Sequence, residues 1–144
     1  MALIHDMAES LVGDITPVDN IPKAEKSRRE STTMDFLCSR LLSPSAGVGP
    51  ATGAQIREIW QEYEDGETLE AKFVHDIDKL ELVLQMMEYE RRGEGQVDLS
   101  EFGHVAKRIQ LDECKAWCEE VFKEREEFWR SVGKPLKAGW RKTG

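Results

Sequence analysis

The feature that most constrains the fold is the spacing of apolar residues, which repeats at helical intervals along most of the 144-residue chain. After Thr68, apolar residues recur at alternating four- and three-residue steps: Phe73, Ile77, Leu80, Leu84 and Met87. Such steps place side chains on one face of an α-helix. Thr68 can cap this helix, which we expect to run to about Glu90. No segment alternates apolar and polar residues over a useful strand length, so the sequence predicts an all-α fold.

The same periodicity predicts further helices, to give about six in all. Their expected ranges are 1–12, 23–42, 54–63, 100–107 and 112–131. In the first of them, Leu3, Ile4, Met7 and Leu11 would form the buried face. Gly13 should end that helix, and Pro22 should open the next one. We expect these helices to form one bundle over residues 1–132, with a flexible insertion at about 43–53 and a basic tail at 133–144.

The net charge and the cysteines limit the cellular compartment and the binding partners of the chain. A formal net charge of −8 disfavours binding to nucleic-acid polymers or anionic membranes, because phosphate backbones require a basic surface. A small phosphorylated substrate is still compatible with this negative charge, since a bound divalent cation can make the local electrostatic potential positive. The three cysteines form no disulfide framework, and no signal peptide or membrane span is apparent. These features favour a cytoplasmic or nuclear protein.

A candidate site lies at the start of the chain. His5, Asp6 and Glu9 share one sector of the expected first helix, opposite its apolar face. One imidazole and two carboxylates suit a divalent transition metal. The same three residues also fit a solvated polar face, and their spacing by itself favours that interpretation.

Two further carboxylates, Asp76 and Asp78, lie within a strongly apolar helical segment. A buried carboxylate is costly unless it is paired or bound to metal. Both have apolar neighbours, so periodicity does not choose between them. The alternative interpretation pairs them with Lys72 and Lys79 at the protein surface.

Other polar or reactive residues have simpler interpretations. Cys114 and Cys118 share a helix face with large apolar residues and are expected to be core thiols. Between residues 23 and 29, a group of basic side chains alternates with glutamates and is expected to form a charged helix face. One of these basic residues could instead steer a phosphate.

Two stretches together resemble the HD-domain 5′-deoxynucleotidases. Residues 2–30 read ALIHDMAESLVGDITPVDNIPKAEKSRRE, and residues 62–90 read EYEDGETLEAKFVHDIDKLELVLQMMEYE. An HD dipeptide alone has no specificity, but HDMAES-x-x-GDITP followed by EAKFV-x-D-x-DK is hard to meet by chance. The resemblance implies an all-helical HD-domain bundle that hydrolyses the 5′-phosphate of deoxynucleoside monophosphates and forms homodimers.

The resemblance also implies which residues hold the metal. His5 and Asp6 match the HD pair, and Asp78 matches the distal Asp of the family. The cation would be manganese, cobalt or magnesium.

The remaining site residues follow from the same resemblance. Glu9 matches the catalytic carboxylate, and Asp14 matches an acid that contacts substrate or a second metal. A second cation would be bound by Glu9, Asp14 and the carbonyl oxygen of Ile15.

The chain departs from the family pattern in one respect. The first His ligand of the family lies on a helix upstream of the HD pair, where this sequence has four residues. We therefore expect an N-terminally truncated HD domain. His75 could substitute as a ligand, although such a residue is more often solvated. The alternatives are a catalytically impaired HD-fold protein that acts by dimerisation, or another HD nucleotide phosphohydrolase.

Overall fold

The computed structural model describes residues 1–42 and 51–134 of the chain. Its regular elements within these ranges are all helical, which confirms the expected all-α fold. The chain divides into two compact units, Met1–Ala71 and Lys72–Gly144, and each is described by itself. No helix among the described residues is both long and apolar enough to cross a bilayer. The expected basic tail at 133–144 lies almost entirely outside the described residues.

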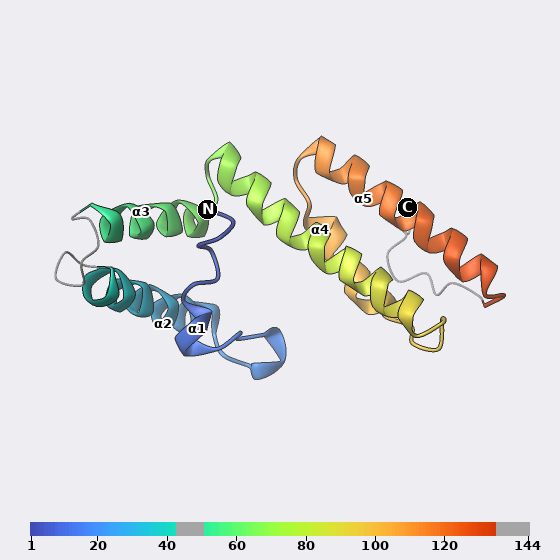
Figure 1. Cartoon of the computed structure of the whole chain (residues 1–144), viewed down its shortest axis with the longest axis horizontal. Coiled ribbons are helices and arrows are strands. Elements are labelled where there is room, and N and C mark those ends of the chain that lie inside the picture. Colours follow the sequence, from blue (N-terminus) through green and yellow to red (C-terminus); the bar gives the residue numbers. More distant parts are fainter. Residues whose placement is uncertain (43–50, 135–144) are drawn as a thin grey trace. The chain divides into compact units, whose positions relative to one another are not determined.

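The described residues of the first unit form three α-helices and two short elements of other helical types. They are α1 (Glu9–Val12), the 3₁₀ turn η1 (Pro17–Asp19), α2 (Lys23–Phe36), the π-helical turn η2 (Leu37–Leu41) and α3 (Thr52–Asp65). In Figure 1, α2 and α3 lie side by side, and Arg57 of α3 donates a hydrogen bond to Asp35 of α2. As expected, Pro22 precedes α2 and Gly13 ends α1, with a positive φ of 78° that suits glycine.

The core of this unit joins the turns before α1 to α2, η2 and α3. Its buried members are Ala8, Met34, Leu37, Cys38 and Trp60. Gly53 permits the close approach of α3 to η2, because a Cβ atom there would lie 2.4 Å from the carbonyl oxygen of Cys38. Thr52 and Gly53, which end the expected insertion, therefore belong to α3, whereas residues 43–50 lie outside the described part of the chain.

The predicted helix over residues 1–12 is wrong for its first two turns. Residues 2–8 form successive tight turns, with backbone bonds such as Ile4 N–H to Met1 and Met7 N–H to Ile4, and only Glu9–Val12 is α-helical. Ile4 and Met7 pack against the core, but Leu3 is 96% exposed and Leu11 is 60% exposed. Over so few residues, a run of turns buries an apolar pair as well as a helix does, so the pattern did not distinguish them.

The second unit is built on two long helices that lie side by side in Figure 1. These are α4 (Leu69–Arg92), whose first turn belongs to the first unit, and α5 (Asp112–Ser131). Between them lies the 3₁₀ element η4 (Ser100–Arg108). The hydroxyl of Thr68 accepts the N–H of Ala71, which confirms the predicted cap of α4.

The core of the second unit differs in part from the predicted stripe on α4. Its buried members are Leu80, Val83, Met86, Ile109, Cys114, Cys118 and Phe122. Phe73 and Leu84, which the stripe places inward, are 42% and 43% exposed. The two cysteines are buried thiols, as expected.

Candidate functional site

The imidazole of His5 and the carboxylate of Asp6 form a close pair in the first unit. His5 Nε2 lies 3.0 Å from Asp6 Oδ2. On its other side, His5 Nδ1 lies 2.8 Å from the carbonyl oxygen of Ala2. The ring also packs on Tyr63 of α3, with 5.0 Å between the ring centroids. Contacts on three sides therefore fix the orientation of the imidazole.

The hydrogen bonding of His5 tests whether the pair suits a metal. A carbonyl oxygen only accepts, so Nδ1 must carry the proton of that bond. In the neutral ring Nε2 then presents a lone pair to a carboxylate oxygen, and the two atoms repel unless a proton or a cation lies between them. Their 3.0 Å separation also matches adjacent ligands in an octahedral site, since bonds of about 2.1 Å at right angles span about 3.0 Å. The His5–Asp6 pair fits a divalent cation.

The distal ligand expected from the sequence lies in the second unit. Asp78 is exposed on α4. Within the described residues, no group of three or more His, Cys, Asp or Glu side chains converges on one point. The structure thus brings His5 and Asp6 together, and it places Asp78 on a separate element.

Asp76 has a structural task that accounts for its buried position. It is fully buried, and its two oxygens accept the backbone N–H groups of Gln110 and Leu111 at 2.8–3.0 Å. Lys79 Nζ lies 3.6 Å from Asp76 Oδ1. The alternative interpretation is therefore right that Lys79 approaches Asp76 but wrong about the surface, because the carboxylate lies inside the unit, where it fixes the backbone that precedes α5. Both of its oxygens already accept backbone hydrogen bonds.

Glu9 lies on α1 and is partly buried. Burial raises the pKa of its carboxyl group, and the nearby carboxylates of Asp6 and Asp14 raise it further. Lys26 opposes this shift, with its Nζ 3.7 Å from Glu9 Oε1. A carboxyl group with a raised pKa retains its proton closer to neutral pH, which suits acid-base catalysis.

Sequence reasoning placed Lys26 on a charged helix face and missed its contacts with Glu9 and the Ile15 carbonyl. The Lys26 ammonium donates to the carbonyl oxygen of Ile15 at 3.2 Å and lies 3.4 Å from Glu30 Oε1. Burial would lower the pKa of Lys26, but the carboxylates of Glu30 and Glu9 outweigh it and raise the pKa. The i,i+4 spacing of Lys26 and Glu30 was a usable signal, whereas its contacts with α1 and the next loop were not visible in the sequence.

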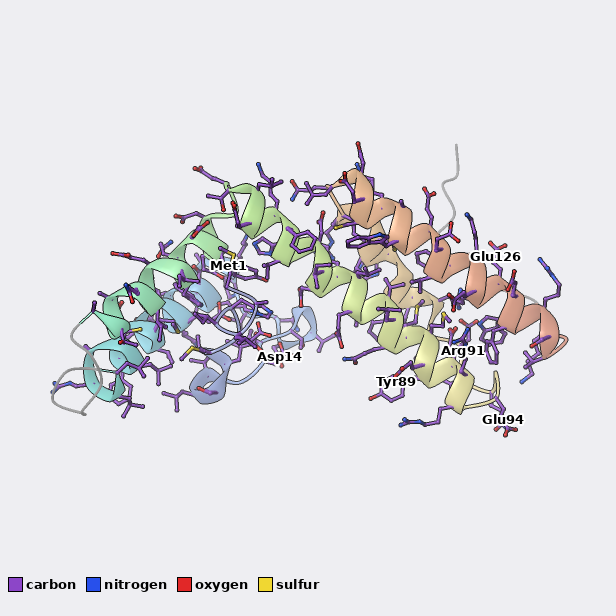
Figure 2. The ribbon with its side chains drawn as sticks, turned by 45° about the horizontal axis from the view of Figure 1, so that its top comes forward. Met1, Asp14, Tyr89, Arg91, Glu94 and Glu126 are labelled. Carbon is purple, nitrogen blue, oxygen red and sulfur yellow. The ribbon has the colours of Figure 1, made fainter. Side chains whose placement is uncertain are left out.

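The loop after α1 carries Asp14, whose side chain is exposed and which is labelled in Figure 2. The loop is held by a capping box in which both the N–H and the hydroxyl of Thr16 donate to Asp19, at 2.7 and 2.8 Å. The remaining basic residues behave as expected, since Arg28 and Arg29 both pair with Glu25. The loop thus has a fixed shape beside Glu9 and Lys26.

Comparison with known proteins shows one consistent likeness. Residues 1–118 match the HD domain family. Over 132 residues, the chain is 47% identical to the 5′-deoxynucleotidase hdd1 of Schizosaccharomyces pombe, which covers 92% of the chain and 65% of that protein. It is 42% identical over the same length to the 5′-deoxynucleotidase YBR242W of Saccharomyces cerevisiae, which covers 92% of the chain and 54% of that protein.

A solved structure gives the same likeness. The HD domain-containing protein YGK1 matches with a TM-score of 0.69 and 34% identity, over 89% of this chain and 63% of that one. The chain therefore spans between about half and two thirds of the length of these relatives.

Proposed function

This chain belongs to the HD domain family, and on that premise we propose that it carries the catalytic part of a 5′-deoxynucleotidase. The HD domain family consists in general of metal-dependent hydrolases. Relatives that match 92% of the chain at 42–47% identity carry the name 5′-deoxynucleotidase. The proposed reaction is hydrolysis of a deoxynucleoside 5′-monophosphate by water, to give the deoxynucleoside and inorganic phosphate.

The observation that carries the proposal is the fixed pair of His5 Nε2 and Asp6 Oδ2, 3.0 Å apart. These two atoms would hold a divalent cation such as manganese, cobalt or magnesium, and Asp78 of α4 would supply the distal carboxylate. When bound, such a cation acidifies a water molecule and neutralises charge on the phosphoryl oxygens. The carbonyl of Ala2 keeps His5 in the tautomer that this role requires.

Proton transfer is assigned to Glu9. Its raised pKa allows it to hold a proton for the departing 5′-oxygen, a poor leaving group that benefits from protonation. Alternatively, its ionised form would accept a proton from the attacking water. Asp14, exposed on the neighbouring loop, is proposed to contact the substrate.

The activity is tested by measuring phosphate release from a panel of nucleotides with Mn²⁺, Co²⁺ or Mg²⁺. We expect hydrolysis of deoxynucleoside monophosphates in preference to ribonucleotides. Cleavage of triphosphates or phosphodiesters instead would assign another HD hydrolase activity. A folded, metal-free protein without turnover after cation addition would support an inactive HD-fold protein.

The metal assignment is tested on α4. Asp78→Asn should reduce both the Mn²⁺ content and the turnover, whereas Glu81→Gln, an exposed change on the same helix, should leave both unchanged. Retention of metal by Asp78→Asn would remove this residue from the site. Glu9→Gln should lower turnover while Mn²⁺ at the His5–Asp6 pair is kept.

We propose further that the chain forms a homodimer, on the family resemblance, and that it acts in the cytoplasm or nucleus, on its cysteine content. Light scattering on the purified chain measures its mass in solution and so tests for the dimer. A mass near the 16.5 kDa of one chain would contradict the dimer.

A further inference from the structure

The position that the family likeness gives to a second cation already contains a positive charge of the protein itself. Two of the three oxygen ligands expected there are the carboxylate of Glu9 and the carbonyl of Ile15. Lys26 Nζ lies 3.7 Å from Glu9 Oε1 and 3.2 Å from the Ile15 oxygen. The third expected ligand, Asp14, is exposed, and it acts on Lys26 through its charge. This arrangement does not fit a second divalent cation while Lys26 stays in place.

Lys26 is held in this position from three segments of the chain. Glu30, one turn further along α2, lies 3.4 Å from its ammonium and is only 7% exposed. Glu9 approaches from α1, and Ile15 approaches from the following loop. An ammonium ion donates three hydrogen bonds and carries one charge, so it satisfies the same oxygens that a hard divalent cation would bind.

We propose that Lys26 is a built-in cation of the site, which competes with a second divalent ion for Glu9 and the Ile15 carbonyl. The residue positions Glu9 and limits the site to the cation held by His5 and Asp6. This inference rests on the proposed function for the role of Glu9, but its test depends only on cation binding.

The test is calorimetric titration of the chain with Mn²⁺ alone. Removing a positive charge within about 4 Å of a divalent ion should strengthen binding by about tenfold or more, after allowance for solvent screening. Lys26→Met should therefore bind an additional Mn²⁺, or bind Mn²⁺ about tenfold more tightly. Lys26→Arg, which keeps the charge, should behave as the wild type. Lys23→Met is the matched control, because it removes an exposed lysine from the same helix.

A second measurement separates this role from a merely structural one. Without divalent ions, Lys26→Met should melt at a lower temperature, because Glu9 and Glu30 lose their shared counter-charge. Mn²⁺ should raise its melting temperature more than that of the wild type. Adding Glu9→Gln to Lys26→Met should abolish the gained Mn²⁺ affinity, which places the new ion at Glu9. If the methionine variant does not fold, Lys26→Gln serves in its place.

Equal Mn²⁺ affinity in the wild type and in Lys26→Met, including an absence of binding in both, would overturn the inference. A gain that survives Glu9→Gln would overturn it as well. If the proposed function fails, a different result is expected: the wild type releases no phosphate with any cation. The two failures are therefore distinguishable.

Discussion

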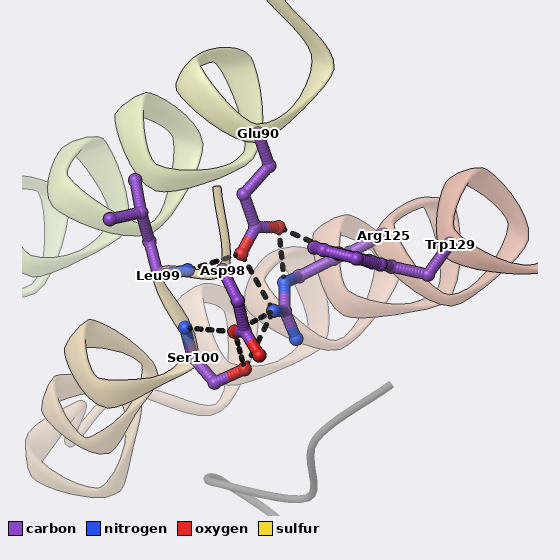
Figure 3. Close-up of polar contacts among 6 residues, drawn as sticks. All are labelled: Glu90, Asp98, Leu99, Ser100, Arg125 and Trp129. Carbon is purple, nitrogen blue, oxygen red and sulfur yellow. Dashed lines mark hydrogen bonds and ion pairs between the residues drawn. The ribbon is translucent and has the colours of Figure 1, made fainter. Parts of the chain in front are cut away.

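The second unit contains a buried ion pair whose removal gives a sharp stability prediction. Arg125 of α5 and Glu90 of α4 are 1% and 0% exposed, and they bond through two contacts of 2.7 and 2.8 Å. Figure 3 shows that the Glu90 carboxylate also accepts the indole N–H of Trp129 and the backbone N–H of Leu99. Arg125 reaches the hydroxyl of Ser100 as well, at 3.0 Å. Every oxygen of the carboxylate is thus used inside the unit.

The expected loss of unfolding free energy follows from the burial of this ion pair. Removing one partner of a buried pair leaves an uncompensated charge and costs about 3–5 kcal/mol, a large share of a typical unfolding free energy of about 5–15 kcal/mol. We expect this full cost for Arg125→Met and a smaller one, about 3 kcal/mol, for Glu90→Gln, because Asp98 Oδ1 still lies 3.7 Å from Arg125 Nη2. In the double variant, the amide oxygen that replaces the Glu90 carboxylate would still accept a hydrogen bond from Trp129 or Leu99, and no charge would be buried alone. The double variant should therefore cost about as much as Arg125→Met alone, so the coupling energy should equal the cost of Glu90→Gln, about 3 kcal/mol.

The assay is urea unfolding, with the indole signal of Trp129 in NMR spectra as the probe of the second unit. At a slope of about 2 kcal/mol per molar urea, Arg125→Met should lower the midpoint by about 2 M and Glu90→Gln by about 1.5 M. Arg91→Met is the matched control: Arg91, labelled in Figure 2, joins the same two helices through an exposed pair with Glu124 at 3.2 Å. It should cost less than about 1 kcal/mol. Additive costs in the double variant, or a loss in Arg125→Met no larger than in the control, would refute the reasoning.

Three further predictions concern other buried positions. Asp76→Ala should destabilise the second unit by about 2–4 kcal/mol in urea unfolding, because the N–H groups that precede α5 lose their acceptor, and an unchanged midpoint would contradict this. Gly53→Ala should lower the melting temperature, at a cost of about 1–3 kcal/mol, because its Cβ would overlap the Cys38 carbonyl oxygen; wild-type melting would show that α3 and η2 separate easily. Burial raises the pKa of Cys118 to about 11, so only about a thousandth of this thiol is ionised at pH 8. Iodoacetamide should therefore label Cys118 in urea but not in the native chain, and mass spectrometry measures the labelling. Rapid native labelling at pH 8 would show that the thiol is accessible.

Much of the fold was predictable because helices depend on nearby residues. The range 112–131 was predicted for the last helix and matches α5, and Thr68 was identified as the cap of α4. The first segment was the exception. Its apolar spacing suggested a helix over residues 1–12, but tight turns satisfy the same short pattern.

The candidate site was predictable to a smaller extent. The sequence placed His5 and Asp6 in one sector, and the structure brings their side chains to 3.0 Å. The assignments of Asp78 as the distal ligand, and of Glu9 and Asp14 to catalysis and substrate binding, remain predictions.

The sequence by itself determined the all-α class, most helix ends and the adjacency of the HD pair, since these follow from residues within a few turns of one another. Only the tertiary structure decided which polar groups are buried and with what partners. Asp76 is buried because backbone groups 34 and 35 residues away meet it, and Glu90 because Arg125 approaches from another helix. Lys26 likewise became part of the site through a loop eleven residues earlier. Such contacts depend on how helices pack, which local spacing does not encode.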